Sequence, residues 1–485
     1  MSSTQAETKK KVATAGHAGQ IGLFSGPIIA GFMLLIGPPD GLSQEGWIVA
    51  AMAVLMAIYW TTEAIPIAVT SLLPLIILPL SGARGMADAA APYADKIIFL
   101  LLGGFILAKA LEHSNLHKRI AWFVLNRTSG SPAGLIGGFM IACALLSMWI
   151  SNTATALMLV GIGVGILAAL DKNNGAGARI APALFLGIAY SASVGGMMTP
   201  VGTPTNLLAL GYVEQLLGRD VSFVMWMGFA VPAGLIMLIA IWRLLVFMHL
   251  RDLSAKDIGS EDIGAQMSVP TPMQRRIFII FLCVVTAWIL RPYLQKLPGL
   301  SGLGDAQIAL SGAAAMFILP SGGRKGERLL TWEAAVQLPW GIVLLFGGGL
   351  ALASAISESG LAAYMGTYLA ALTSLHPLLV LMCVAAIVAG LTEVSSNTAT
   401  LAALLPVIGA FAPDDAAITL MVTLAATLAA SCAFMMPVAT PPNAIVMASG
   451  RLSIIDMVRT GIWLNILGIV VIAFASWLIA PQLFT

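Results

Sequence analysis

Long apolar segments separated by short polar connections run through almost the whole chain. A segment of about 20 apolar residues suits a helix that crosses the hydrocarbon core of a bilayer, because all its backbone groups pair within the helix. A transmembrane β-barrel would instead show alternating segments of about ten residues. We therefore predict an all-α polytopic membrane protein with eleven spans. The spans are expected near residues 23–37, 47–60, 66–82, 97–112, 182–199, 222–247, 277–294, 305–320, 338–356, 417–436 and 461–480.

Two further apolar segments, 133–170 and 377–411, are each interrupted by a Ser-Asn-Thr triplet, at 151–153 and at 396–398. Successive helix positions rotate by about 100°, so three adjacent polar residues cannot all face one neighbouring helix. Irregular backbone at membrane depth is tolerated where protein or a water-filled cavity surrounds it. We therefore predict two re-entrant helical hairpins, each with its triplet at the tip.

The chain contains two related halves. The segment 102–116 aligns with 346–361, and the two triplets align at the same separation of 245 positions. The segments 197–206 and 435–443 also match, with Thr203 and Thr440 separated by 237 positions. An odd number of predicted spans lies between equivalent points, so the halves are expected to face opposite ways across the membrane. Inverted repeats with discontinuous helices are typical of secondary transporters, which bind their substrate at the repeat interface.

Proline-rich stretches are expected to break the helices 182–210 and 417–450. Pro200 and Pro204, for example, lack amide hydrogens and cannot continue a helix ladder. Freed carbonyls together with Ser, Thr and Asn oxygens suit Na⁺, whereas half-helix N-termini favour an anionic group. Neither the hairpins nor the broken helices contain Lys or Arg. The counter-charge for an anionic substrate would therefore come from amides, helix dipoles and bound cations.

Composition and charge exclude several other classes of protein. The chain has 485 residues, of which 59% are hydrophobic and 9% charged. Its four cysteines lie in apolar segments without paired spacing, so neither a disulfide framework nor a metal site is expected. No nucleophile or metal constellation suggests an enzyme, and no nucleic-acid partner is expected. A channel would need a continuous polar pore rather than two isolated breaks.

The distribution of basic residues predicts the orientation. With the N-terminus in the cytoplasm, 19 of the 24 Lys and Arg residues lie on the cytoplasmic side and 5 lie outside, as the positive-inside rule requires. The C-terminus then lies outside, and a bacterial inner membrane is the expected location.

Coupling to protons would need a titratable group within the membrane, and the candidates are few. Glu63 is interpreted as an interfacial or helix-start acid. Glu393, three residues before Ser396, is kept as a group that could support the site or carry a proton. Neutral oxygens dominate the unusual segments, which favours Na⁺ as the coupling ion.

The motifs "ISNTATALM", "TEVSSNTATLAALLP", "TPVGTPTN", "MMPVATPPNAIVMASG" and "TTEAIPIAVTSLLPL" together resemble the divalent anion:sodium symporter family, in particular its bacterial sodium-coupled dicarboxylate transporters. The resemblance covers the chain from about residue 20. It implies a homodimer in the lipid bilayer, with a scaffold domain and a transport domain that moves as an elevator. It also implies at least two Na⁺ sites, each between a hairpin tip and a helix break.

The expected domain layout follows the repeats. The first repeat follows a cytoplasmic tail (1–20) and consists of scaffold helices (21–128), which include an interfacial arm helix at 115–127, and the first part of the transport domain (129–250). A cytoplasmic linker (251–276) leads to the second repeat. That repeat consists of scaffold helices (277–375), which include an arm at 360–375, and the second part of the transport domain (376–485).

By position, the resemblance assigns ligands to both hairpin tips and both breaks. The implied Na⁺ ligands are Ser147, Ser151, Asn152 and Gly202 at the first site, and Thr392, Ser395, Asn397 and Ala439 at the second. The implied substrate contacts are Ser151, Asn152, Thr153, Thr203, Ser396, Asn397, Thr398 and Pro441. Ser147 and Thr392 occupy equivalent repeat positions, and both carry a hydroxyl, which favours two similar sites.

The function expected from this resemblance is Na⁺-coupled symport of C4-dicarboxylates such as succinate, malate and fumarate into the cell. A Na⁺-independent dicarboxylate exchanger of the same family is the alternative. Citrate and sulfate stay open as substrates, because the sequence does not give the length of the binding pocket.

Overall fold

A computed structural model describes residues 17–128, 130–251, 253, 269–323, 326–369, 375–409 and 415–484. Most of the predicted tail and of the predicted linker, residues 1–16, 252 and 254–268, lie outside this part of the chain. The described residues form helices and connections, with a single isolated bridge between Pro320 and Arg328. The all-α prediction is confirmed.

The first half of the chain forms twelve α-helices and one 3₁₀ turn. They are α1 (His17–Ile36), α2 (Gln44–Thr62), α3 (Ile67–Thr70), α4 (Leu73–Leu80), α5 (Met86–Ala90), η1 (Ala91–Ala94), α6 (Lys96–His113), α7 (Leu116–Thr128), α8 (Pro132–Ser147), α9 (Asn152–Asn174), α10 (Ala176–Met197), α11 (Pro204–Leu217) and α12 (Phe223–His249).

The second half forms eleven α-helices among its described residues. They are α13 (Pro272–Leu294), α14 (Asp305–Ile318), α15 (Trp332–Ala335), α16 (Trp340–Glu358), α17 (Leu361–Leu369), α18 (Pro377–Thr392), α19 (Asn397–Gly409), α20 (Ala416–Ala430), α21 (Pro441–Ala448), α22 (Ile454–Leu478) and α23 (Ala480–Phe484).

Eight helices in the described part of the chain are long and apolar enough to cross a membrane, judged by length and composition. Each predicted span falls on helical structure, although the span at 66–82 consists of two short helices, α3 and α4, separated at Ser71 and Leu72. The number of spans and the re-entrant nature of the two hairpins stay predictions.

The repeat seen in the sequence is also a repeat of helix boundaries. Helices α8 and α18 begin at Pro132 and Pro377, and both are 16 residues long. Proline suits the first turn of a helix because the amide hydrogen that it lacks would have no partner there. The arm helices α7 and α17 follow Asn115 and Gly360, whose φ values of 56° and 78° place both in the left-handed region. The predicted arm at 360–375 is described only as far as Leu369.

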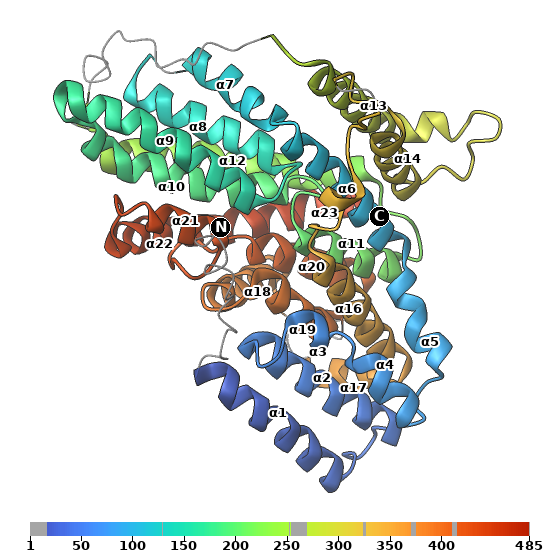
Figure 1. Cartoon of the computed structure of the whole chain (residues 1–485). Coiled ribbons are helices and arrows are strands. Elements are labelled where there is room, and N and C mark those ends of the chain that lie inside the picture. The colour runs from blue at the N-terminus through green and yellow to red at the C-terminus, as the bar shows by residue number, and fades with distance from the viewer. Residues whose placement is uncertain are drawn as a thin grey trace, which may run out of the picture.

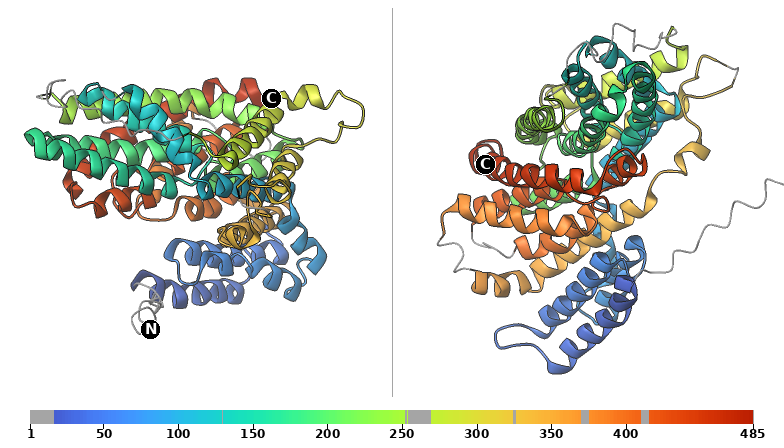
Figure 2. Two further views of the ribbon diagram at one scale, coloured as in Figure 1. Left: turned by 45° about the horizontal axis from the view of Figure 1, so that its top comes forward. Right: turned by 90° about the vertical axis from the view of Figure 1, so that its left-hand side faces the viewer.

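The helices of the two halves are interleaved (Figures 1 and 2). Helices α1–α4 lie at one side of the molecule, and α7–α10 and α12 lie at the opposite side. The helices α16–α22 lie between these two groups, where α19 packs against α2 and α21 packs against α9 and α10. Helices α10 and α20, which precede the two breaks, are buried along nearly their whole length. They therefore give both breaks a rigid support.

Candidate functional site

The two hairpin tips and the two helix breaks form the wall of one cavity of about 590 Å³. All the residues assigned above as substrate contacts line it, which are Ser151, Asn152, Thr153, Thr203, Ser396, Asn397, Thr398 and Pro441. The second tip comes close to the helix that follows the first break, because the hydroxyl oxygens of Thr398 and Thr205 lie 3.4 Å apart. Segments about 200 positions apart in sequence are thus brought together around a single space.

Each hairpin tip lies between the end of one helix and the start of the next. Helix α8 ends at Ser147, and α9 begins at Asn152, with the Ser151 hydroxyl accepting a hydrogen bond from the Ala154 amide at 3.2 Å. The first amides of a helix have no partner within that helix, and its N-terminus carries a partial positive charge. Because α9 and α19 both start at the cavity, they direct this favourable end of the dipole toward an anionic ligand.

The predicted first cation site contains a surplus of oxygen lone pairs. The fully buried Ser147 hydroxyl oxygen lies 2.5 Å from the carboxamide oxygen of Asn152 and 2.7 Å from the carbonyl oxygen of Ala192. One hydroxyl hydrogen serves only one of these two acceptors. A cation bound among the oxygens would satisfy the lone pairs that remain.

The second site repeats this arrangement. The Thr392 hydroxyl oxygen lies 2.5 Å from the carboxamide oxygen of Asn397 and 3.0 Å from the carbonyl oxygen of Ala430. Ser395 donates a hydrogen bond to the Leu391 carbonyl at 2.8 Å, and its hydroxyl lies 2.5 Å from that of Thr400. The chemistry of both sets, hydroxyl and carbonyl oxygens without nitrogen or sulfur, is the one that hard cations such as Na⁺ prefer.

Some of the residues assigned as Na⁺ ligands line the cavity, and the others lie behind its wall. Ser151, Asn152, Gly202, Ser395, Asn397 and Ala439 line its wall. Ser147 and Thr392 lie behind it and are 0% exposed. Among the described residues no cluster of three or more His, Cys, Asp or Glu side chains that could hold a metal is present. The assignment of individual ligands stays a prediction.

The two sites differ at the glycines of the first break. A Cβ atom on Gly196 would lie 2.5 Å from the Asn152 carboxamide oxygen, and one on Gly202 would lie 2.3 Å from the Gly196 carbonyl oxygen. The equivalent positions of the second break, 237 residues later, are Ala433 and Ala439. The first site therefore depends on two glycines, whereas the second accommodates a methyl group at each position.

Two equivalent asparagines bridge the breaks, and the sequence analysis gave them no role. The Asn206 carboxamide donates to the carbonyls of Gly196 and Thr199 at 3.0 and 2.7 Å. Asn443 donates to the carbonyls of Ala433 and Met436 at 2.9 and 3.0 Å. Asn206 thus ties α11 to the end of α10 and to the first break, and Asn443 ties α21 to the second break. The signal in the sequence was their common spacing of 237 positions.

Glu393 holds the second break from the adjacent hairpin tip. Its carboxylate is 3% exposed and accepts hydrogen bonds from the consecutive backbone amides of Phe434, Met435 and Met436 at 2.8–3.1 Å. The Asn465 carboxamide donates a further bond at 2.6 Å. Position 148, the equivalent of 393 in the first repeat, is a methionine. There the Thr199 hydroxyl donates to the backbone carbonyl of Met148 at 2.5 Å instead.

Glu63 lies at the cavity but does not start a helix, so that part of its interpretation is wrong. Helix α2 continues to Thr62, and Glu63 is its C-terminal cap with φ 48° and ψ 38°. An L-residue in this left-handed conformation costs about 1 kcal/mol or more relative to a right-handed one, which is why glycine is usual there. Glu63 is exposed and lines the same cavity wall as the hairpin tips.

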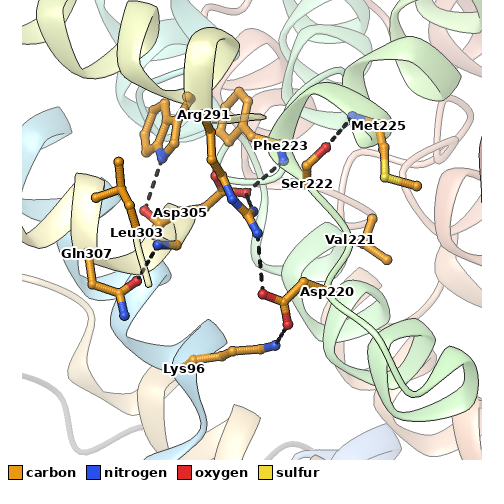
Figure 3. Close-up of polar contacts among 12 residues, drawn as sticks. Lys96, Asp220, Val221, Ser222, Phe223, Met225, Arg291, Leu303, Asp305 and Gln307 are labelled. Carbon is orange, nitrogen blue, oxygen red and sulfur yellow. Dashed lines mark hydrogen bonds and ion pairs between the residues drawn. The ribbon is translucent and has the colours of Figure 1, made fainter. Parts of the chain in front are cut away.

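A second polar cluster lies at the start of α6 and around the connection between α11 and α12 (Figure 3). Lys96 forms ion pairs with Asp220 and, at 3.0 Å, with Glu214. Arg291 of α13 pairs with Asp220 at 3.3 Å and with Asp305 of α14 at 2.9 Å. The Lys96 ammonium, which donates a hydrogen bond to Asp220, holds the pKa of that carboxyl below its ordinary value. The sequence analysis missed this cluster.

The cluster joins helices of different parts of the fold. The backbone amide of Phe223, the first residue of α12, donates to the Asp305 carboxylate at 2.8 Å. Close by, the first hairpin tip meets α13, because the Trp149 ring packs edge-on against Phe281 with 5.0 Å between ring centroids. The tip and the α11–α12 connection are therefore both fixed to α13.

Comparison with known proteins places the chain in a family. The family profile described as "Sodium:sulfate symporter transmembrane region" matches residues 20–484. The chain is 38% identical to the sodium-dependent dicarboxylate transporter SdcS of Staphylococcus saprophyticus, with 98% of this chain and 94% of that protein covered. It is 37% identical to SdcS of Staphylococcus aureus strain NCTC 8325, with 98% and 93% covered.

Two solved structures share the fold at low sequence identity. MtrF of Neisseria gonorrhoeae superposes with a TM-score of 0.55 at 15% identity, covering 92% of this chain and 97% of MtrF. The YdaH transporter of Alcanivorax borkumensis gives 0.56 at 14% identity, covering 94% and 98%. These likenesses concern the fold alone.

The family profile and the relatives above 30% identity both match nearly the whole chain. They show that this protein belongs to the sodium:sulfate symporter family, also called the divalent anion:sodium symporters, and is a membrane transporter rather than an enzyme.

Proposed function

We propose that this protein is a Na⁺-coupled symporter that brings C4-dicarboxylates such as succinate, malate and fumarate into the cell. The observation that carries the proposal is the duplicated contact between a buried hydroxyl and an Asn carboxamide, Ser147 with Asn152 and Thr392 with Asn397, beside one shared cavity. The relatives at 37–38% identity are named sodium-dependent dicarboxylate transporters, which supports the same coupling ion and substrate class.

The shape of the site supports a substrate with an anionic group at each end. The two Ser-Asn-Thr tips contribute matching amide, hydroxyl and carboxamide groups to one cavity from two sides. A volume of about 590 Å³ lies within the usual range for small-molecule sites and leaves room for a four-carbon dianion with water. One carboxylate would contact Asn152 and Thr153, and the other Asn397 and Thr398, with Thr203 and Pro441 nearby.

The dependence of substrate binding on Na⁺ follows from the charges of the cavity wall. Among the described residues neither Lys nor Arg lines the cavity, so these residues provide only amides and dipoles against two negative charges. Na⁺ ions bound behind the two tips would supply the missing positive charge close to both carboxylates. A site built in this way binds the dianion well only after Na⁺ has bound, and at least two Na⁺ ions would accompany each substrate.

The architecture supports alternating access by an elevator movement. In this proposal α8–α12 and α18–α23 move as the transport domain, and the other long helices form a scaffold that makes the homodimer. The cavity wall includes Phe105 of α6 and Ile342 of α16, so the site lies at the boundary between these two parts. The charge bias places the N-terminus inside and the C-terminus outside in the bacterial plasma membrane. In that orientation Glu63 and Pro339 lie at the cytoplasmic ends of their helices.

The proposal is tested by uptake of labelled succinate into liposomes that contain the purified protein. We expect uptake with an inward Na⁺ gradient and none when choline replaces Na⁺. Unlabelled malate and fumarate should compete at low concentration, and citrate and sulfate weakly. Uptake that persists without Na⁺, but only into liposomes preloaded with dicarboxylate, would contradict symport and make the protein an exchanger. Stronger competition by sulfate than by succinate would contradict the substrate class.

A further inference from the structure

The described residues that line the cavity proposed for a dianion include only one ionisable residue, and that residue is acidic. The wall consists of apolar residues and neutral Ser, Thr and Asn side chains, apart from Glu63. Within the described part of the chain, the Glu63 carboxylate has no hydrogen-bond or ion-pair partner. A negative charge without a partner therefore faces the space in which an anion is expected to bind.

The backbone gives no reason for a glutamate at this position. With φ 48° and ψ 38°, Glu63 caps α2 in a conformation that glycine adopts without strain. Among the described residues the only other non-glycine residue with positive φ is Asn115, and asparagine tolerates this region better than glutamate does. Strained residues of this kind are often retained for what their side chain does. Glu63 is one of the residues that line the cavity.

Glu63 also belongs to a different part of the fold from the predicted ligands. It follows α2, whereas the tips and breaks belong to α8–α11 and α18–α21. If the transport domain moves, the Glu63 charge stays with the scaffold. Its effect on the bound ligands would then depend on which side of the membrane the site faces.

We propose that Glu63 is a specificity-determining residue that makes dicarboxylate binding depend on Na⁺. Its carboxylate repels a dianion that enters the cavity alone and attracts Na⁺ into the same space. Once Na⁺ is bound, the cation charge outweighs that of Glu63 and the dianion binds. Glu63 thereby suppresses transport of dicarboxylate without Na⁺. This inference rests on the proposed function and concerns how strictly dicarboxylate transport depends on Na⁺.

The test compares Glu63→Gln with Glu63→Asp, which keeps the charge, and with Glu63→Gly, which removes both the charge and the backbone strain. Glu45→Gln is the matched control, because Glu45 is an exposed acid at the other end of the same helix. Purified proteins are titrated with NaCl at constant ionic strength, with succinate binding as the readout. The same proteins are reconstituted for succinate uptake with and without Na⁺.

We expect Glu63→Gln and Glu63→Gly to raise the half-saturating Na⁺ concentration by about 3- to 10-fold, the scale of a lost charge interaction through partly hydrated space. We also expect both variants to show measurable succinate binding without Na⁺. Glu63→Asp and Glu45→Gln should match the wild type. The differences should shrink in high concentrations of choline chloride, since salt screens exposed charges.

Three results separate the possible failures. If the wild type takes up succinate only with Na⁺ and Glu63→Gln shows the same Na⁺ dependence, the role of Glu63 is wrong and the proposed function stands. If Glu63→Asp loses Na⁺ affinity as Glu63→Gln does, a steric role replaces the electrostatic one. If the wild type itself binds succinate equally with and without Na⁺, the proposed symport fails before Glu63 is considered.

Discussion

The hydroxyl oxygen of Ser147 and the carboxamide oxygen of Asn152 lie 2.5 Å apart, across the turn between α8 and α9. They are five positions apart in the sequence, and the second repeat places Thr392 and Asn397 at the same distance. An exposed turn needs no such contact, and both hydroxyls are fully buried. Two repeats that keep the same pair of oxygens indicate that the pair itself is required.

Removal of either hydroxyl should weaken Na⁺ binding without unfolding the protein. Ser147→Ala and Thr392→Val each delete one oxygen of a predicted cation site and preserve most of the side-chain volume. We expect the half-saturating Na⁺ concentration for succinate uptake to rise at least about tenfold in each, corresponding to roughly 1.4 kcal/mol. Thr392→Ser should retain affinity near that of the wild type. Ser476→Ala is the control, because Ser476 is fully buried in α22 and does not line the cavity.

The two breaks should respond differently to an added or a removed methyl group. Gly202→Ala would force a Cβ to within 2.3 Å of the Gly196 carbonyl oxygen, and Gly196→Ala would displace the Asn152 carboxamide. Overpacking of this kind typically costs about 1–3 kcal/mol. We expect both variants to lose Na⁺-driven uptake, whereas Ala433→Gly and Ala439→Gly should keep most of it. Equal losses from all four substitutions would show that the two sites do not differ in this way.

The sequence was sufficient to predict the helices and the repeat, because these depend on local patterns, and the family resemblance supplied the residues that line the cavity. A polar triplet in an apolar segment and a fixed spacing of 245 positions are visible without coordinates. Contacts between distant segments were not predictable. Lys96 and Asp220 are 124 positions apart, and Glu393 and Phe434 are 41 apart. No local pattern indicates that either pair meets. The interpretation of Glu63 as a helix-start acid was wrong, because α2 extends to Thr62 and Glu63 caps its C-terminus.

Glu393 should contribute to stability through the backbone that it holds. Its carboxylate accepts from three backbone amides and from Asn465, so all nearby groups are donors. In Glu393→Gln the carboxamide NH₂ would face donors, and hydrogen bonds to a charged acceptor would be lost, at a cost of roughly 2–3 kcal/mol. We expect a lower melting temperature in detergent and a weaker second Na⁺ site.

The control for Glu393 is Glu45→Gln, which removes an exposed carboxylate of the same size. Its melting temperature should match that of the wild type. If Glu393 instead carried a coupled proton, Glu393→Gln would keep its stability and would abolish a pH dependence of uptake. That combination would contradict the structural role.

The ion pairs around Asp220 should stabilise the arrangement seen here in a pH-dependent manner. Lys96 holds the pKa of Asp220 below its ordinary value, so the folded protein favours the charged carboxylate. A carboxyl with a lowered pKa contributes stability above its ordinary pKa, and the contribution disappears as the pH falls through the lowered value. We therefore expect Asp220→Asn to melt below the wild type at pH 7, and the difference to vanish under acidic conditions. Asp220→Glu, which keeps the negative charge between Lys96 and Arg291, should melt closer to the wild type at pH 7 than Asp220→Asn does. A difference in melting temperature that stays constant from pH 7 to acidic pH would show that the Asp220 charge is not responsible.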